Sequence, residues 1–189
     1  EANETELPEG AEGWFAIPRF EAVAPTYGEA VEKALDLINK SRKFKSYEGR
    51  LHERYLRQSE RTKQRFAELA EKQSGDILIV PAQFGFRHRG KSVRCARETF
   101  AEQEFGLGVF ACGTFLLTHP EREVGEEQLH IDCSGDEYSP GADGQFVYAP
   151  VFYWGEPIIY PNGGGLRFSS YRTSVNVHYG SASGFLPQE

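Results

Sequence analysis

Apolar residues between positions 27 and 39 recur at intervals of three and four, which is the spacing of one helix face. This pattern predicts a helix from about Tyr27 to Asn39. Thr26 is a suitable N-cap, because its hydroxyl can accept a hydrogen bond from a free N–H of the first turn. The predicted core face comprises Ala30, Val31, Ala34, Leu35, Leu37 and Ile38.

A second set of apolar positions predicts a longer helix from about Tyr47 to Gln73. The stripe has a polar gap between Gln58 and Thr62. Together the two helices would form a helical hairpin over residues 27–74, joined by a basic connector at residues 40–45. The apolar stripe of the second helix comprises Tyr47, Leu51, Tyr55, Phe66, Leu69 and Ala70.

After residue 75 the apolar runs are shorter. Ile77–Val80 predicts a central strand, and the glycines within Phe84–Gly90 predict a loop. Residues from Ser92 to about Glu104 have helical spacing. The apolar run Val109–Thr118 is either a buried strand or a buried helix, because periodicity does not separate these two.

The second half of the chain has the pattern of a sheet. Leu129–Cys133 alternates as a half-buried strand does, and after Gln145 charged residues become rare while aromatic residues are dense. Strands are predicted at Phe146–Trp154, Ile158–Tyr160, Leu166–Tyr171 and Ser174–Tyr179, with a hairpin loop at Pro161–Gly165.

Residues 1–26 are acidic and contain three prolines, so they predict an extended arm. Its large apolar residues would pack on the arm's own domain or on a neighbouring subunit. The remaining residues, 27–189, are expected to form a single α+β domain in which 75–189 is mainly β with one helix. The fold class is therefore α+β, with the arm and the basic helical hairpin packed against a mostly antiparallel C-terminal sheet.

Composition narrows the class of protein. A chain of 189 residues with 39% hydrophobic content can bury a core as one soluble domain. No apolar run approaches the roughly 18 residues of a membrane span, so no membrane partner is expected. The three cysteines are widely spaced and form no CxxC motif, which predicts reduced thiols and a cytoplasmic or other reducing compartment.

Charge is strongly segregated along the chain. Residues 40–97 hold 16 of the 21 Lys and Arg residues, although the whole chain has a net charge of −7. On the predicted long helix, arginines at positions 50, 54, 57, 61 and 65 recur every three or four residues and would form one ladder. A second basic block lies around the predicted loop and the start of the helix that follows it.

Such a surface would neutralise the phosphates of a nucleic acid or engage an acidic protein surface. The alternatives are salt bridges within the chain, and self-association through the arm and the aromatic C-terminal half. The residues expected to bind the anion are Arg50, Arg54, Arg57, Arg61, Arg87, Arg89, Lys91, Arg94 and Arg97.

A different group of residues would suit catalysis. His119, His130, Asp132 and Cys133, together with the carboxylates Asp136 and Glu137, lie within nineteen residues. His130 and Asp132 would project from the same face of one strand. The two histidines and Asp132 could hold a metal ion, or the histidines could activate Cys133 as a nucleophile. Solvated strand residues and a core thiol would give the same pattern.

The sequence therefore favours a non-enzymatic binding or assembly protein with an arginine-rich face and no cofactor. A metal- or thiol-dependent hydrolase, and a structural subunit of a larger particle or filament, are the alternatives.

Overall fold

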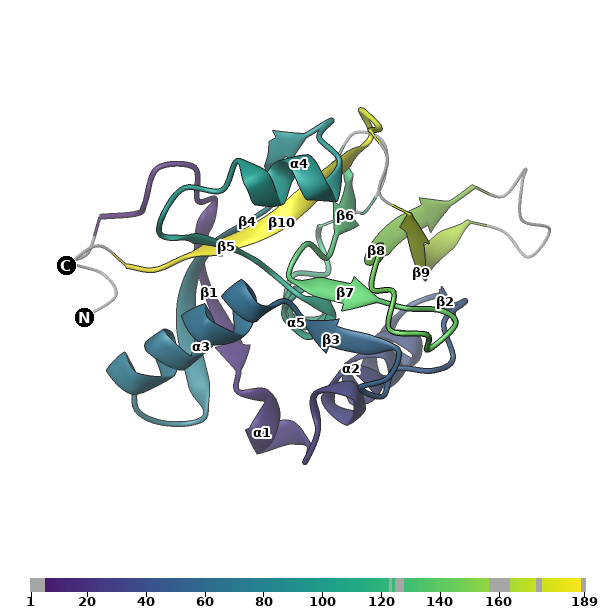
Figure 1. Ribbon diagram of the computed structural model, residues 1–189, viewed down its shortest axis with the longest axis horizontal. Helices are drawn as coiled ribbons and strands as arrows, with labels where there is room; N and C mark the ends of the chain where they lie inside the picture. The colour runs from purple at the N-terminus through teal and green to yellow at the C-terminus, as the bar shows by residue number, and fades with distance from the viewer. Residues whose placement is uncertain (1–5, 123, 125–127, 157–163, 173–174, 188–189) are drawn as a thin grey trace.

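The computed structural model describes residues 6–122, 124, 128–156, 164–172 and 175–187 (Figure 1). Within these ranges the chain forms five helices and ten strands. The helices are α1 (Phe20–Val23), α2 (Tyr27–Ser41), α3 (Glu60–Lys72), α4 (Val93–Glu98) and α5 (Val109–Thr118). The strands are β1 (Gly13–Pro18), β2 (Phe44–Ser46), β3 (Leu56–Gln58), β4 (Ile77–Arg89), β5 (Glu104–Gly106), β6 (His130–Asp132), β7 (Asp136–Tyr138), β8 (Tyr148–Gly155), β9 (Gly165–Arg172) and β10 (Tyr179–Phe185).

The described strands form one ten-stranded sheet whose main path runs β1-β4-β10-β6-β8-β7-β3. Strand β5 pairs with β10, and β9 pairs with both β8 and β2. All of these pairs are antiparallel except β10 with β6 and β2 with β9. The predicted α+β class with a mostly antiparallel sheet is thus confirmed.

Helix α5 lies at the centre of the main core. Its Phe115 ring stacks on Phe84 of β4 at 3.4 Å between centroids, and its Gly113 lies against Ala34 of α2 and Phe152 of β8. Eight of its ten residues are buried, which explains why the apolar run at 109–118 shows no amphipathic period. The run is a helix rather than a strand.

Helix α4 lies on the other side of the sheet, along β10 (Figure 1). Helix α2 packs against α5. The capping box of α2 at Thr26 and Glu29 confirms the predicted helix start. The sheet therefore has one face that carries the main core and an outward face that α4 covers in part.

The predicted long helix at 47–73 is wrong. The chain there forms the short strand β3, and only α3, which begins after the N-cap Ser59, is helical. The Ser59 hydroxyl accepts a hydrogen bond from Thr62 N, so the polar gap at Gln58–Thr62 is a helix start rather than a weak part of one helix. Residues 27–74 accordingly do not form a helical hairpin.

The predicted loop at Phe84–Gly90 is also wrong for most of its length, because β4 runs through it to Arg89. Gly85 has a φ of +124°, and the pairing register with β10 shifts between Gly180 and Ala182. A Cβ atom at Gly180 would overlap the Gly85 carbonyl, so these glycines form a bulge where two backbones approach closely. The sequence pattern predicted a loop because glycines usually indicate one, but here Gly85 lies within a strand.

Other boundaries differ as well. The helix predicted to reach Glu104 ends at Glu98 and is followed by β5. Because the run at 109–118 is also helical, the described part of residues 75–189 contains two helices rather than the predicted one. The strand expected at Ser174–Tyr179 lies further on, as β10. The predicted strand Ile158–Tyr160 lies outside the described residues, as does most of the hairpin loop after it.

The N-terminal segment is not a free arm where it is described. Strand β1 pairs along β4 from Gly13 to Pro18, and Phe15 packs edge-on against Phe84 and Phe115 of the core. This segment therefore adds an edge strand to the chain's own sheet.

Candidate functional site

The basic residues expected to bind an anion mostly contact oxygen atoms of the chain itself. Arg57 pairs with Glu137 at 2.9 Å, and Arg97 donates to the carbonyls of Ser134 at 2.8 Å and Asp136 at 2.7 Å. Hydrogen bonds to side chains or carbonyls are also donated by Arg50, Arg61, Arg87, Arg89, Lys91 and Arg94. These contacts agree with the alternative in which the basic residues pair with other groups of the same chain.

The arginine ladder does not exist as one helix face. Arg61 and Arg65 lie on α3, whereas Arg50, Arg54 and Arg57 precede it in a loop and in β3. Arg61 and Arg65 both donate to the carbonyl of Glu102, so they fasten α3 to the segment before β5. The regular spacing in the sequence thus crosses a change of secondary structure.

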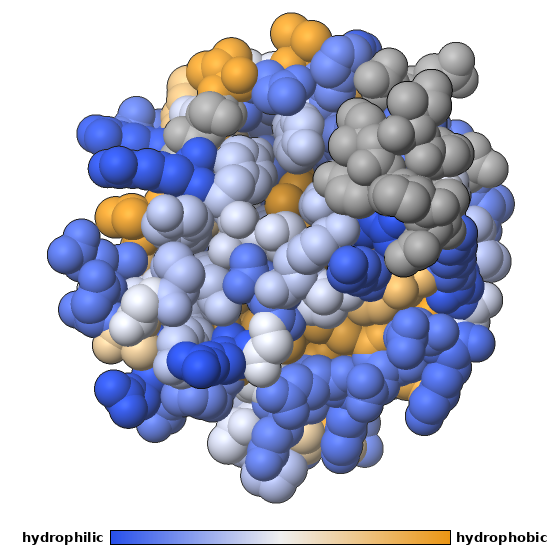
Figure 2. All heavy atoms as spheres, turned by 90° about the vertical axis from the view of Figure 1, so that its right-hand side faces the viewer, coloured by the Kyte–Doolittle hydropathy of each residue, from blue (hydrophilic) through white to orange (hydrophobic). Residues whose placement is uncertain are grey.

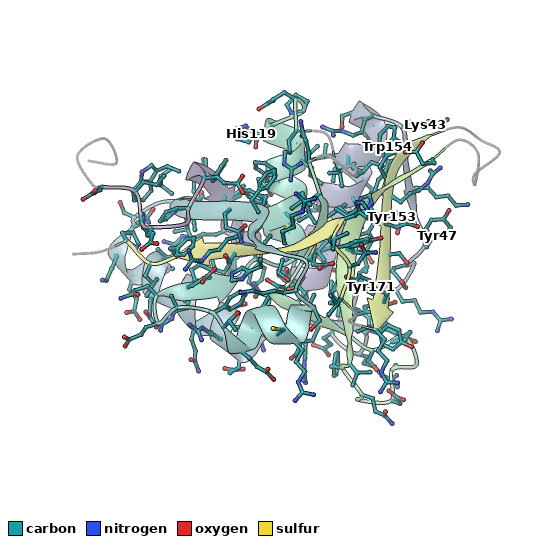
Figure 3. The ribbon with its side chains drawn as sticks, turned by 90° about the horizontal axis from the view of Figure 1, so that it is seen from above. Lys43, Tyr47, His119, Tyr153, Trp154 and Tyr171 are labelled. Atoms are coloured by element: carbon teal, nitrogen blue, oxygen red, sulfur yellow. The ribbon has the colours of Figure 1, made fainter. Side chains whose placement is uncertain are left out.

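The alternative catalytic residues are not brought together. His130 and Asp132 lie on one face of β6, as alternation predicts, but that is the outward face of the sheet. His119 ends α5, where its ring packs against Phe115, and Figure 3 shows it well apart from Tyr171, the residue that contacts Asp132. Among the described residues, no group of three His, Cys, Asp or Glu side chains could hold a metal ion.

Cys133 points into the core. Its thiol is fully buried beside Cys112 of α5, and burial raises its pKa well above the ordinary value. A thiol that keeps its proton is a poor nucleophile. The structure therefore separates Cys133 from both histidines and suits it to packing.

A cavity of about 270 Å³ lies between α1, α3 and the start of α5. Its walls include the rings of Phe20, Phe66 and Phe110, and the small side chains of α3 face it. Lys63 and Gln58 contribute its polar groups on the α3 side. The lining is mainly apolar but open to solvent, and its polar groups come from Arg19, Glu21, Tyr27, Gln58 and Lys63. A mainly apolar hollow with a few polar groups is a common form of small-molecule site.

The floor of this cavity is a buried hydrogen-bond network. The Tyr27 hydroxyl donates to Asp136, at 2.9 Å from Oδ1 and 2.7 Å from Oδ2, and Val109 N donates to Oδ2 at 2.7 Å. Burial raises the pKa of Asp136 to about 7. The carboxyl caps the first turn of α5 and joins it to α2 through Tyr27.

Gly108 makes this network possible. It is the N-cap residue of α5, and a Cβ atom there would overlap both Asp136 Oδ1 and Tyr27 Oη. The absence of a side chain lets the carboxyl approach the helix start. Both the cavity and the cap therefore depend on this position.

Arg19 holds the far wall of the cavity. Its guanidinium donates to the carbonyls of Ala70 at 2.9 Å, Gln73 at 2.5 Å and Gly75 at 2.7 Å. These oxygens end α3, where a positive charge is favourable. The α1 segment is thereby tied to α3 across the cavity.

A shallower hollow of about 510 Å³ continues from the cavity toward β3. The two share Phe20, Tyr27, Gln58 and Lys63. The charged residues that line the hollow are balanced: Glu29, Glu32 and Glu53 are acidic, and Arg54, Arg57 and Lys63 are basic. Cavity and hollow together extend from α3 and α1 past the start of α2 to β3.

A third hollow of about 350 Å³ lies between α2, β2 and residues 48–51. Leu35, Phe44 and Leu51 give it an apolar base, and Glu32, Asp36 and Glu48 lie at its border. Figure 2 shows the side of the molecule that carries α2 and β2, with hydrophobic surface recessed between hydrophilic side chains. Among the described residues that line it, none is basic.

Sequence reasoning did not find the cavity residues. Phe20 was assigned to an arm, while Tyr27 was only the first residue of a helix. The cavity joins residues up to 94 positions apart, from Ile17 to Ala111. The sequence contains one indication of this cavity, because the basic stretch at residues 40–97 includes Lys63 of the cavity wall.

Comparison of the chain with protein-family models, curated proteins and solved structures gives no match. Among the described residues, no helix combines the length and apolar character needed to cross a bilayer.

Proposed function

We propose that this chain is a binding protein for a small ligand that has an apolar body and an anionic group. The observation that carries the proposal is the aromatic cavity between α1, α3 and α5, with Lys63 on its wall. The apolar body would fill the space between the rings, and the anion would pair with the Lys63 ammonium. Apolar burial would supply most of the affinity, because a half-exposed ammonium contributes at most about 1 kcal/mol.

The charged side chains that line the cavity are Arg19, Glu21 and Lys63, and of the two basic groups Lys63 is the one less engaged within the chain. The Arg19 guanidinium is engaged by three carbonyls, and the Asp136 carboxyl is engaged by Tyr27 and Val109. Lys63 lies 3.8 Å from Glu60, and both side chains are more than half exposed, at 51% and 75%. Such a weak surface pair can be exchanged for a ligand anion at little cost.

This proposal retains the anionic partner that the charge distribution predicts, with a small molecule in place of a nucleic acid. Nucleic-acid binding through the arginine-rich residues stays a separate prediction. It requires an affinity that falls steeply with salt, because each phosphate contact releases a counterion.

The test uses two fluorescent probes, 8-anilinonaphthalene-1-sulfonate and its neutral analogue N-phenyl-1-naphthylamine. Ala67→Trp would fill the cavity from α3 and should weaken both probes at least tenfold. Gln64→Trp, at a position of the same helix that is likewise exposed but outside the cavity lining, is the matched control and should leave both unchanged. Equal probe binding by wild type and Ala67→Trp would exclude the cavity as the site.

The charge is tested separately. Lys63→Gln should weaken the sulfonate probe about two- to fivefold and leave the neutral probe unchanged, since an exposed ion pair contributes up to about 1 kcal/mol. Lys40→Gln, at an exposed position near the end of α2, is the control for net charge. Equal losses for Lys63→Gln and Lys40→Gln would contradict a specific role for Lys63.

A further inference from the structure

On the outward face of the sheet, polar and aromatic side chains surround Asp132. The register places Ser181 of β10 beside Asp132 and Tyr179 beside His130. Tyr171 reaches across from β9, and its hydroxyl donates to Asp132 Oδ1 at 2.6 Å. This cluster lies on the opposite side of the sheet from the main core, so it is distinct from the cavity at α5.

Aromatic rings form the walls of the cluster. The Tyr179 ring lies 4.6 Å from His130 and 5.7 Å from Tyr171 between centroids, and Tyr153 of β8 lies 6.1 Å from His130. The three tyrosines are half-buried, so each ring is partly open to solvent. Figure 3 shows Tyr153 and Tyr171 on neighbouring strands at this end of the molecule.

Only one of the two carboxyl oxygens of Asp132 has a hydrogen-bond partner among the described residues. Asp132 is fully buried, yet its Oδ2 has no hydrogen-bond partner within the described part of the chain, and the same holds for the buried Ser181 hydroxyl. A buried acceptor without a donor costs about 1–3 kcal/mol. Asp132 Oδ2 therefore favours a ligand that donates a hydrogen bond, and the hydroxyl oxygen of Ser181, at the paired position of the neighbouring strand, can accept a second one.

The carboxyl also has no counter-ion among the described groups that influence it. Burial raises the pKa of Asp132 to about 7, and only the Tyr171 hydroxyl opposes this shift. His130 is not a competing cation, because burial lowers its pKa to about 4 and its Nδ1 accepts a hydrogen bond from Trp154 N. A cationic ligand would therefore find a carboxyl that has no counter-ion among the described groups.

We propose that this cluster binds a small molecule carrying a primary ammonium group. The ammonium donates to Asp132 Oδ2 and to the Ser181 hydroxyl oxygen, and the faces of the surrounding tyrosines stabilise its charge. Aromatic rings around a cation are a recognised arrangement for ammonium ions. Because the carboxyl itself is buried, a half-buried tyrosine ring must turn aside as the ligand enters.

The experiment follows the ring signals of the tyrosines by NMR while butylammonium chloride is added. Sodium chloride at equal ionic strength is the baseline, and 1-butanol is the neutral analogue. We expect saturable shifts of the Tyr153, Tyr171 and Tyr179 signals with butylammonium and none with 1-butanol. Tetramethylammonium, which has the charge but no N–H donor, should bind at least threefold more weakly.

Asp132→Asn is the decisive variant. Its carbonyl oxygen can still accept from Tyr171, but an NH₂ donor replaces the Oδ2 acceptor. Butylammonium affinity should fall at least tenfold, whereas Asp76→Asn, at an exposed carboxylate, should bind as the wild type does. Unchanged affinity in Asp132→Asn, equal shifts with 1-butanol, or equal affinity for tetramethylammonium would each overturn the proposal.

Discussion

Asp132 and Asp136 are four residues apart and both fully buried, yet their surroundings differ in kind. Asp136 accepts three hydrogen-bond contacts from Tyr27 and Val109 and lies beneath the cavity. Asp132 accepts one, from Tyr171, and its second oxygen has no partner in the described chain. Burial raises both pKa values to about 7, so a shifted pKa alone does not separate a structural carboxyl from one with a free acceptor.

The largest expected effect comes from removing each carboxyl in turn. Asp136→Ala leaves the Tyr27 hydroxyl and Val109 N–H without their acceptor, so the free energy of unfolding should fall by roughly 3–5 kcal/mol. Asp132→Ala frees only the half-buried Tyr171 hydroxyl and also removes a buried acid, so a loss of about 1 kcal/mol or less is expected. Urea denaturation measures both, and equal losses would contradict the contrast.

The next effect concerns the helix start above Asp136. Gly108→Ala should cost about 1–3 kcal/mol, because its Cβ would overlap Asp136 and Tyr27 in a packed site. Gly49→Ala is the control, since a Cβ there meets no atom within 4 Å and should change stability by less than about 0.5 kcal/mol. A neutral Gly108→Ala variant would show that the cap can move, and the cavity floor with it.

The pH dependence sharpens the comparison further. An acid whose folded pKa is raised from 3.8 to about 7 stabilises the fold fully below the lower value, and this stability is lost as the pH rises through the upper one. Each unit of difference corresponds to about 1.4 kcal/mol. Asp132→Asn removes one of the two groups, so unfolding measured from pH 4 to 8 should show a smaller decline than in the wild type.

The part of that decline that remains in Asp132→Asn belongs to Asp136 and to other groups. Glu104 acts in the opposite sense. Burial raises its pKa, but its hydrogen bonds, chiefly to His88 and Ser183, together outweigh burial and hold the pKa at about 2, below its ordinary value of 4.5. Its contribution is present above pH 4.5 and is lost as the pH falls toward 2. Identical curves for Asp132→Asn and the wild type would contradict a titrating Asp132.

The sequence predicted the local elements better than the sites. Periodicity located α2 and its Thr26 cap, and alternation placed His130 and Asp132 on one strand face. It failed between residues 47 and 58, where helical spacing of the arginines continued through a loop and β3. The spacing of residue types along the chain indicates a geometry that repeats locally. A strand of three residues such as β3 is too short to show a period, and it is held in place by a partner distant in sequence, β7.

The two sites were not predictable for a related reason. Whether Asp132 or Asp136 has partners depends on Tyr171 and Tyr27, which reach them from 39 and 109 positions away in the sequence. The arginines show the same dependence, since Arg57 and Arg97 meet the acidic Glu137 only after folding. A count of charges therefore identified an excess of basic residues but not its partner.

The smallest effect separates two serines on one face of β10. The Ser183 hydroxyl bonds Glu104 at 2.5 Å and accepts from Gln83 at 2.8 Å, whereas the Ser181 hydroxyl has no partner in the described chain. Ser183→Ala should cost about 1–2 kcal/mol, because it leaves a buried carboxylate short of a donor. Ser181→Ala should stay within about 0.5 kcal/mol of the wild type in buffer without amines, since no bond is lost.

Adding butylammonium should then widen this small difference. A ligand that binds only the folded state stabilises it, so the wild type should gain stability with concentration and Ser181→Ala should gain less. Ser183→Ala, which leaves Asp132 and Ser181 intact, should gain as much as the wild type. If Ser181→Ala were destabilised in buffer as much as Ser183→Ala, its hydroxyl would already have a partner, and the outward face would be as complete as the floor of the cavity.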